Sequence, residues 1–389
     1  MPPLERIYLD YAATTPINAE VLDVLLLHSK ESFGNASSVH SFGRTSKVIL
    51  EESRELIARS INAEPGEIVF TSGGTEADNH ALIGAALARR RNSGKNHILI
   101  SSVEHHAVLE CAEYLSECGF VISQIPVDTA GRVHLNEVEN LLRSDTAIVS
   151  VMHGNNEVGT LQPIEEISAL CKSKNILFHT DTVQTFGKIP VDVKQLGIDF
   201  AVFSSHKIYG PKGIGALYIR NGVEIDSLIH GGAQERNHRA GTENIPSLAG
   251  FALAVKKSVD VMPELQKHLK KCKTMMTAML QSQIEGLQIN GGAELSLPSI
   301  LSVSLDHSIY DIESETLLLQ LDLHGVAASS GSACTSGSIQ PSHVLQAMGK
   351  DAKTAKSTVR FSFGKNTTVE EIETASKIFI EIVSALPKK

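Results

Sequence analysis

Hydrophobic positions follow two different periods over the first two thirds of the chain. Short apolar runs predict buried strands, and the segments between them repeat apolar residues every three to four positions, as amphipathic helices do. Apolar strands that alternate with helices are typical of a mostly parallel sheet covered on both faces. The expected strands are 67–70, 97–100, 147–151, 176–179 and 199–203, and the expected helices include 46–62 and a segment from the glycines at 73–74 to about 91.

A second block begins near residue 261 and lacks this strict alternation. Its expected helices are 264–284, 312–323 and 369–386, and its expected strands are 300–305 and 358–363. Helices and strands that mix in this way predict a smaller α+β domain.

Composition narrows the classes of function. The 389 residues are 42% hydrophobic and 20% charged, which is ordinary for a globular protein with a sizeable core. A net charge of −9 argues against bulk binding of nucleic acid. The first residues lack the order of a signal peptide, and the longest apolar stretches, such as 248–255, are too short to span a bilayer. We therefore expect neither a nucleic-acid partner nor a membrane partner.

The five cysteines form no Cys-x-x-Cys pair, and their number is odd. A disulfide framework is therefore not expected, and a reducing cytosol is the default compartment. Cys111, Cys118, Cys171 and Cys272 lie in helix-like patterns and are expected to be inert. Cys334 lies instead in a loop of small polar residues, 328–338, where a thiol is accessible. A reactive cysteine there would need nearby positive charge to lower its pKa, and a plain Ser/Gly linker fits the same residues.

Lys207 is the most informative residue. It follows the apolar run 199–203 and stands in a segment that contains glycine and proline, 204–213. A lysine at the mouth of a buried strand is costly to desolvate, which lowers its pKa from about 10.4 and makes the amine a nucleophile. Such an amine can attach covalently to a carbonyl cofactor such as pyridoxal phosphate. An exposed or phosphate-facing lysine fits this segment equally well.

Two further segments supply what such a cofactor needs. In the segment 70–79 an expected strand leads through Gly73 and Gly74 into a helix, whose N-terminal N–H groups suit a phosphate. Thr75 can cap this helix or bind a phosphate oxygen, and a capped helix after a tight turn is the alternative. Asp181 ends another buried strand, one helix-plus-strand unit before Lys207, so both are expected at the same edge of the sheet. A carboxylate there can pair with a pyridine nitrogen, form an internal ion pair or cap a helix.

The segment Glu104-His105-His106 combines two histidines with a carboxylate, and Glu110 lies close by. The spacing matches no zinc motif, so we expect no metal site. A histidine that stacks on an aromatic cofactor, or a surface histidine, fits the segment better.

Taken together, these segments resemble cysteine desulfurases of the NifS and IscS type. This group belongs to the class-V aminotransferases among the fold-type I pyridoxal-phosphate enzymes. The loop 329–336 is similar to the branch with the longer cysteine loop. The similarity runs nearly end to end and includes YLDYAATTP at 8–16, TSGGTE at 71–76, MHGNNEVG at 152–159, SHKIYGPKG at 205–213, SSGSACTS at 329–336 and VRFS at 359–362.

The resemblance implies a role for each matching residue. Lys207 holds pyridoxal phosphate, Asp181 pairs with the pyridine nitrogen, and Gln184 binds the ring hydroxyl. His105 stacks on the ring and moves protons, and Cys334 receives the sulfur as a persulfide. The phosphate is bound by Gly74, Thr75, Ser204 and His206, joined by Thr242 of the partner subunit, and the substrate carboxylate is held by Asn156 and Arg360, with Asn156 also beside the cofactor.

The same resemblance implies an organisation and an activity. A large domain at 14–257 would carry a mostly parallel seven-stranded sheet, and a small α+β domain at 1–13 and 258–389 would carry the mobile cysteine loop at about 328–340. The implied enzyme is a cytoplasmic homodimer that converts L-cysteine to L-alanine. It would deliver sulfur to iron–sulfur cluster assembly or to another acceptor, such as a tRNA-thiolation protein.

Alternatives remain at this point. Another class-V aminotransferase or a selenocysteine lyase would share Lys207, Asp181 and the phosphate segment, and only Cys334 in its loop separates them. A sulfur-relay scaffold without turnover is a third alternative, which the intact set of site residues disfavours. The short end of the chain after residue 386 favours NifS-like members over those with a scaffold-binding tail.

Overall fold

A seven-stranded sheet forms the centre of the larger part of the molecule in this computed structural model, which describes residues 6–330 and 341–389. Strands β3 to β7 run parallel, whereas β8 runs antiparallel to both of its neighbours. The prediction of a mostly parallel seven-stranded sheet is therefore confirmed. The spatial order is β2 (Ile68–Thr71), β8 (Gly215–Ile219), β7 (Phe200–Ser204), β6 (Leu177–Asp181), β5 (Thr146–Ser150), β3 (His97–Ser101) and β4 (Val121–Ile125).

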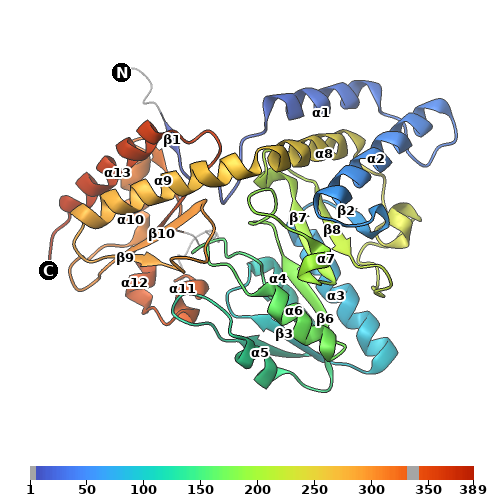
Figure 1. Ribbon diagram of the computed structural model, residues 1–389, viewed down its shortest axis with the longest axis horizontal. Helices are drawn as coiled ribbons and strands as arrows, with labels where there is room; N and C mark the ends of the chain where they lie inside the picture. Colours follow the sequence, from blue (N-terminus) through green and yellow to red (C-terminus); the bar gives the residue numbers. More distant parts are fainter. Residues whose placement is uncertain (1–5, 331–340) are drawn as a thin grey trace.

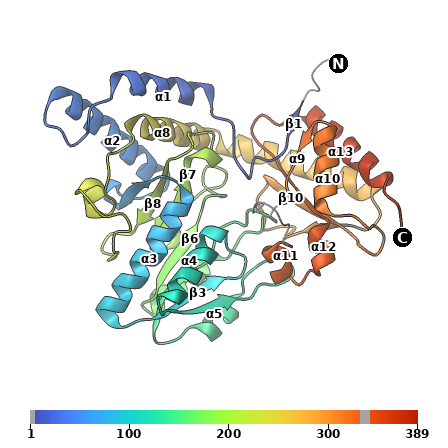
Figure 2. The same cartoon turned by 180° about the vertical axis from the view of Figure 1, so that it is seen from behind.

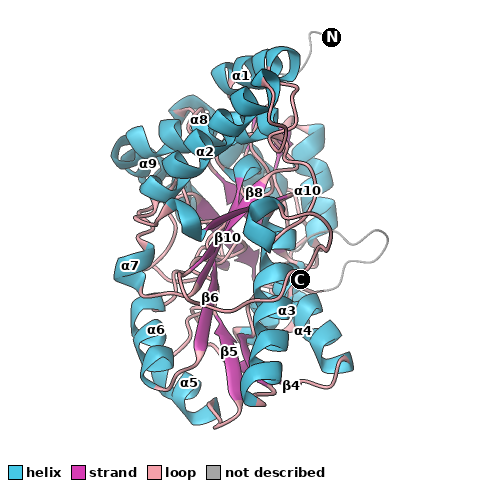
Figure 3. Cartoon of the chain, turned by 90° about the vertical axis from the view of Figure 1, so that its right-hand side faces the viewer, coloured by secondary structure: helices cyan, strands magenta, loops and turns pink. Residues whose placement is uncertain are grey.

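The strands are apolar on both faces because each face is covered by helices. In β3, Ile98 and Ile100 pack on the side of α3 (Gly74–Ser93) and α4 (His106–Glu117), whereas Leu99 faces the opposite core. This alternation follows from the two-residue repeat of a strand. Figure 3 shows α3 and α4 on one side of the strands and α6 (Ile164–Ser173) and α7 (Val193–Leu196) on the other.

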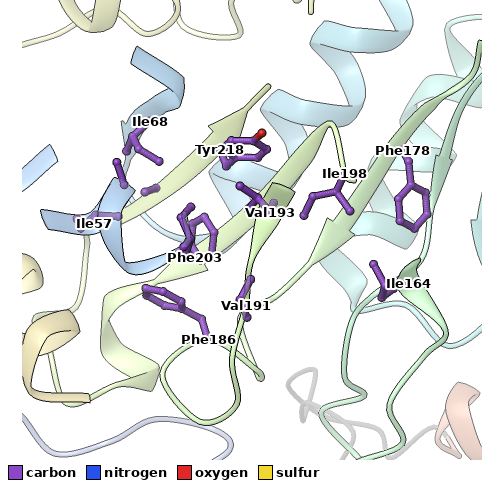
Figure 4. Close-up of a cluster of buried hydrophobic side chains, with 14 of the residues drawn as sticks. Ile57, Ile68, Ile164, Phe178, Phe186, Val191, Val193, Ile198, Phe203 and Tyr218 are labelled. Atoms are coloured by element: carbon purple, nitrogen blue, oxygen red, sulfur yellow. The ribbon is translucent and has the colours of Figure 1, made fainter. Parts of the chain in front are cut away.

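The second face carries the larger core. Figure 4 shows Phe178 and Phe203 from the strands together with Ile57 and Ile164 from the covering helices, all of them buried. The remaining helices of this part of the molecule are α1 (Ala19–Glu31), α2 (Ser41–Ser60), α5 (Leu135–Leu141) and α8 (Ile245–Asp260), with short 3-10 turns at Pro65–Glu67, Ser205–Lys207 and Gln234–Asn237.

A separate hydrophobic core holds the smaller part, which lies beside the sheet (Figure 1). Its antiparallel sheet has the order β12 (Thr358–Ser362), β10 (Ile300–Leu305), β9 (Leu287–Asn290), and β1 (Ile7–Tyr8) pairs in parallel with β11 (Val326–Ala327). Both ends of the chain lie at this part of the molecule (Figure 2). Its helices are α9 (Met262–Gln283), α10 (Ser314–Leu323), α11 (His343–Ala347), α12 (Ala352–Lys356) and α13 (Val369–Ser384).

The order of the strands indicates where on the sheet a ligand would bind. Strand β3 lies between β4 and β5, so the chain changes its direction across the sheet between β3 and β5. Open α/β sheets bind ligands at the carboxyl ends of strands where this reversal occurs. The loops that follow β3, β5, β6 and β7 all meet at that edge.

The start of one helix differs from the expected position. Helix α2 begins at Ser41 rather than 46, because the ring of His40 accepts the N–H of Gly43 at 3.2 Å and so caps the helix. Gly43 allows this start, since a β-carbon there would lie 2.2 Å from the carbonyl oxygen of Ser38.

Within the described residues, no helix is both long enough and apolar enough to cross a bilayer. The expected limits of the two domains stay a prediction.

Candidate active site

A cavity of about 240 Å³ lies at the edge of the sheet where the strand order reverses. Of the residues predicted from the sequence, nine line it: Gly74, Thr75, His105, Asn156, Asp181, Gln184, Ser204, His206 and Lys207. They come from the start of α3, the start of α4, and the segments at or after the ends of β5, β6 and β7. Asp78, Met152 and Val183 complete the lining. From the strand positions alone, only Asp181 and Lys207 were expected to lie at the same edge of the sheet.

Lys207 enters the cavity from the 3-10 turn that follows β7. Its Nζ donates hydrogen bonds to the carbonyl oxygens of Ala12 at 2.6 Å and Ala13 at 2.8 Å. Burial and the charge of Arg360 lower the pKa of Lys207 to about 8 from 10.5, against the opposing pull of Asp181. Half of this amine is therefore uncharged near pH 8, and the uncharged form is a nucleophile and a base.

Two features hold the Lys207 turn in place. Gly210 is required because a β-carbon there would lie 2.0 Å from Oγ of Ser205. The carbonyl oxygen of His206 accepts the N–H and the hydroxyl of Thr15, at 3.0 and 2.8 Å. The segment 12–15 near the chain start is thus fixed against the turn that carries Lys207.

Asp181 closes β6 and is buried below the cavity. One carboxylate oxygen, Oδ1, accepts the N–H of Val183 at 2.8 Å. Burial raises the pKa of Asp181 to about 6 from 3.8, although this hydrogen bond and the charge of Lys207 both act to lower it. A cationic group of a ligand beside Asp181 would lower the pKa of this carboxyl again, because opposite charges favour ionisation.

His105 is both a lining residue and the cap of α4. Its Nδ1 accepts the backbone N–H of Ala107 at 3.1 Å, so the neutral ring carries its proton on Nε2. Burial, followed by the charge of Lys207, lowers the pKa of His105 to about 4. The ring is therefore neutral at pH 7 and can lie against an aromatic ligand. His106 next to it is exposed, with its Nδ1 3.5 Å from Glu110.

The cavity continues into a second hollow of about 370 Å³ at the start of α3. Gly73, Gly74 and Thr75 line this hollow with Ser204, His206 and the exposed Lys212. Backbone N–H groups in the first turn of a helix have no partner within the helix, and the helix end is positive. Gly215 on β8 permits the tight glycine turn, since a β-carbon there would meet Gly73 Cα at 2.8 Å. This end of the site therefore suits an anion such as a phosphate.

Arg360 reaches the site from β12 of the smaller part. Its Nη1 donates to the carbonyl oxygen of Asn156 at 2.9 Å, and its Nη2 donates to Oδ1 of Asp10 at 2.8 Å. Its Nε is buried and has no hydrogen-bond partner among the described residues. The guanidinium thus lies beside Asn156, a lining residue, and its pairing with Asp10 was not foreseen; the substrate-binding role of the two residues stays a prediction.

The remaining predicted residues fall outside this cavity. Thr242 is exposed and does not line the cavity of its own chain, so its expected role in a partner subunit stays a prediction. Cys334 lies outside the described residues. Three other cysteines, Cys111, Cys171 and Cys272, are buried in helices, whereas Cys118 follows the end of α4 and is exposed. In the described ranges, no group of three or more His, Cys, Asp or Glu side chains is placed to hold a metal ion.

Several charged residues of the site were missed from the sequence. Asp78 lines the cavity, and its position one helical turn after Gly74 and Thr75 could have indicated this. Glu104 is fully buried and accepts the N–H of Met152 at 2.7 Å. Lys188 is buried behind Gln184. Nothing in the local sequence marks these last two as buried, because their surroundings come from distant segments.

Comparison with known proteins gives one consistent result. The family model for class-V aminotransferases matches residues 7–374. A cysteine desulfurase IscS of Dictyoglomus turgidum is 45% identical over 98% of this chain and 95% of its own length. A putative cysteine desulfurase IscS 1 of Bacillus subtilis is 47% identical over 98% of this chain and 100% of its own. A solved NifS-like protein superposes with a TM-score of 0.90 at 40% identity and covers 97% of this chain and 99% of that structure.

Proposed function

This chain belongs to the class-V aminotransferase family, and we propose that its cavity is the active site of a pyridoxal-phosphate-dependent cysteine desulfurase. The enzyme converts L-cysteine to L-alanine and transfers the sulfur to an acceptor. One observation supports this most strongly: a desolvated lysine, a buried carboxylate and a helix N-terminus line one cavity of about 240 Å³. These are the groups that the coenzyme requires, and few other ligands need all three.

The residues present fit pyridoxal phosphate. Lys207 would bond to its aldehyde carbon, and Asp181 would face the pyridine nitrogen, whose positive charge offsets the burial of that carboxylate. Gly74, Thr75, Ser204 and His206 would hold the phosphate in the hollow at the start of α3. When bound, the coenzyme withdraws electrons from the α-carbon of the substrate.

Protons in this site are handled by two groups with lowered pKa values. Lys207, with a pKa of about 8, would take up and return a proton at Nζ beside the substrate. His105 presents Nε2 to the cavity side because its Nδ1 is occupied by the Ala107 N–H. We assign to His105 the orientation of the ring and the movement of a proton at Nε2.

Arg360 and Asn156 would hold the substrate carboxylate. The unpartnered Nε of Arg360 offers a buried N–H that a carboxylate can accept. The second N–H of Nη2 or Nη1 can complete a two-point contact, since each already gives only one bond to the protein. A substrate without a carboxylate would leave this donor unsatisfied and should be rejected.

Cys334 is proposed as the sulfur acceptor. A bond forms between its sulfur and the sulfur of the substrate, and the carbon–sulfur bond of the substrate breaks. The electron pair left on the β-carbon takes up a proton, so the products are alanine and a persulfide on Cys334. Delivery to iron–sulfur cluster assembly or to another acceptor, such as a tRNA-thiolation protein, would follow from this persulfide.

The surface supports a homodimer. Large apolar side chains are exposed on α1 and α2 and on the loop between them, with Val39 88% and Phe33 70% exposed. Exposed apolar patches of this kind are typical of protein interfaces. A second copy of the chain placed there is also consistent with Thr242 completing the phosphate site of its neighbour. With its free cysteines, the enzyme is expected to act in the cytoplasm.

The proposed activity has a direct test. Purified protein loaded with pyridoxal phosphate should form alanine and sulfide in equal amounts from L-cysteine when a thiol reductant is present. An aminotransferase would instead give a keto acid without sulfide. The acceptor can be identified by adding candidate acceptor proteins and following which one gains persulfide.

A further inference from the structure

Lys188 is a buried cation without an acidic partner. The side chain is 8% exposed, and its Nζ donates a hydrogen bond to Oε1 of Gln184 at 3.0 Å. Among the described residues no carboxylate lies within 4 Å of Nζ, and the nearby charges that act on it are the cations Lys207 and Arg360. A buried, unpaired lysine is costly, so its presence beside the active site calls for a role there.

The contact with Lys188 fixes which way the amide of Gln184 points. A lysine ammonium has donors only, so the amide atom that faces it must be the oxygen. The amide nitrogen therefore faces the other way, where Nε2 donates to the carbonyl oxygen of Ala12 at 2.9 Å. Its second N–H remains for the cavity that Gln184 lines.

The backbone sets up this contact. Residues 182–189 form a tight series of turns, in which Lys188 N–H donates to Thr185 O and Ile189 N–H donates to the same oxygen. Gln184 and Lys188 are four positions apart in this helix-like segment, so their side chains lie on one side. Gly187 between them has a φ of 71° and a β-carbon position 2.7 Å from Ile208, which excludes larger residues and holds the turn against the core.

We propose that Lys188 is a positioning residue that holds the amide of Gln184 with its N–H toward the ring hydroxyl of the bound coenzyme. Without Lys188 only the contact with Ala12 O opposes a half-turn of the amide, after which its oxygen would face the hydroxyl oxygen. This inference rests on the proposed function, since it concerns the coenzyme of that site. Burial and the charges of Lys207 and Arg360 lower the pKa of Lys188 to about 7. The neutral amine still donates to Gln184 but also has a lone pair, so in that form the acceptor Ala12 O keeps Nε2 of Gln184 on its side and Oε1 toward Lys188.

The test is a double-mutant cycle on coenzyme binding. Apoprotein of the wild type, Lys188→Met, Gln184→Ala and the double variant is titrated with pyridoxal phosphate, and the visible absorbance gives the Kd. Loss of one oriented hydrogen bond predicts that Lys188→Met and Gln184→Ala each weaken binding about fivefold. Adding Lys188→Met to Gln184→Ala should then change the Kd less than twofold.

The outcomes separate this inference from the function on which it rests. A wild-type protein that forms no visible coenzyme band contradicts the proposed function itself. Normal binding by the wild type with an unchanged Kd in Lys188→Met overturns only the role of Lys188. Equal effects of Lys188→Met in both backgrounds also overturn it, because Lys188 would then act without Gln184.

Folding is controlled separately. Urea unfolding of each apoprotein shows whether the variants are intact, and replacing an unpaired buried cation by methionine is expected to raise stability. If Lys188→Met does not fold, Lys188→Arg and Lys188→Gln carry the test. Arginine keeps a donor that reaches Gln184 and should bind coenzyme within twofold of wild type, whereas the shorter glutamine should show the fivefold loss. Equal binding by these two variants would overturn the proposal.

Discussion

Two buried arginines in different regions of this protein differ in how fully their N–H groups are paired. The side chains of Arg54 and Arg360 are 3% and 5% exposed. Arg54, on α2, forms a two-point ion pair with Glu235 at 2.7 Å for both contacts, and two further N–H groups reach Ile68 O and Glu51. Arg360, in the active site, has one contact with Asp10, one with a carbonyl oxygen and an unpartnered Nε.

The difference follows from what each region does. In the Arg54–Glu235 pair both carboxylate oxygens accept hydrogen bonds from the guanidinium, so we call the pair closed. Oε2 of Glu235 also accepts the N–H of Phe70, and Glu235 therefore holds the loop at 234–237 against β2. That loop contains three consecutive non-glycine residues with positive φ, 44° to 68°, a strained conformation that the ion pair helps to maintain. The active site keeps open donors and desolvated carboxyls, because a ligand must satisfy them. Of these two buried arginines, the one with the fuller set of partners holds the structure, and the one with an unpartnered Nε lies beside the cavity.

The largest expected effect separates activity from stability. Cys334→Ala removes the proposed sulfur acceptor and should lower sulfide formation from L-cysteine roughly a thousandfold or more. The visible band of bound coenzyme should be unchanged, because Cys334 is not assigned to its binding. Undiminished sulfide formation would refute the role of Cys334, and loss of the coenzyme band would point to a structural role instead.

Glu235→Ala opens the closed pair and tests the other region. It leaves Arg54 buried without its partner, which should reduce the free energy of unfolding by roughly 3–5 kcal/mol. Urea unfolding of the variant and the wild type measures this difference. The fraction that stays folded should keep the kcat of the wild type. A loss below about 1 kcal/mol, the range of exposed pairs, would contradict the structural role given to this ion pair.

Arg360→Lys makes the matched change in the active site. A lysine cannot reproduce the planar fork of N–H groups, so kcat/KM for L-cysteine should fall by roughly 30- to 100-fold. Stability should fall by less than in Glu235→Ala, since a lysine keeps the positive charge beside Asp10. Arg54→Lys is the control: it should lower the free energy of unfolding and leave the kcat/KM of the folded enzyme unchanged. If Arg360→Lys impaired stability and left kcat/KM intact, the comparison between the two arginines would fail.

Glu104→Gln tests the desolvated carboxyls through pH. Burial raises the pKa of Glu104 to about 8 from 4.5, so the folded protein keeps a proton that the unfolded chain has released. Between about pH 4.5 and pH 8, the protein releases the proton of Glu104 when it unfolds. The free energy of unfolding of the apoprotein therefore falls as the pH rises through this range. The glutamine variant, which still accepts the Met152 N–H, should gain roughly 1–3 kcal/mol relative to wild type at pH 8.

The gain from Glu104→Gln should shrink to about 0.4 kcal/mol near pH 4.5, where the carboxyl is protonated in the folded protein and half protonated in the unfolded chain. Urea unfolding of both apoproteins at the two pH values gives the comparison. A gain of equal size at both pH values would mean that packing, and not ionisation, explains it.

Local patterns predicted the sheet, whereas most of the cavity residues, among them Asn156, Gln184 and Ser204, were implied by the family resemblance. Apolar runs indicated the strands, and the positions of Asp181 and Lys207 directly after two of them indicated a shared edge. The limits of α2 were wrong at its start, since the His40 cap and the packing of Gly43 have no periodic signal. The roles of Thr242 and Cys334, and the two-domain limits, stay predictions.

What the sequence could not indicate depends on contacts between distant segments. Arg54 and Glu235 are 181 positions apart, and Arg360 and Asp10 are 350 positions apart. A buried carboxyl such as Glu104 looks like any polar residue at a helix start until the packing around it is known. Lys188 likewise resembles a surface lysine of a loop, and only its depth behind Gln184 shows otherwise.

The central claim is that one desolvated amine, Lys207, binds the coenzyme. The direct measurement is borohydride reduction of the coenzyme-loaded protein, followed by peptide mass spectrometry. The account predicts a phosphopyridoxyl group on the peptide that contains Lys207, and none on Lys207→Ala treated in the same way. A label on another lysine of the wild type, or a reducible coenzyme retained by Lys207→Ala, would contradict it.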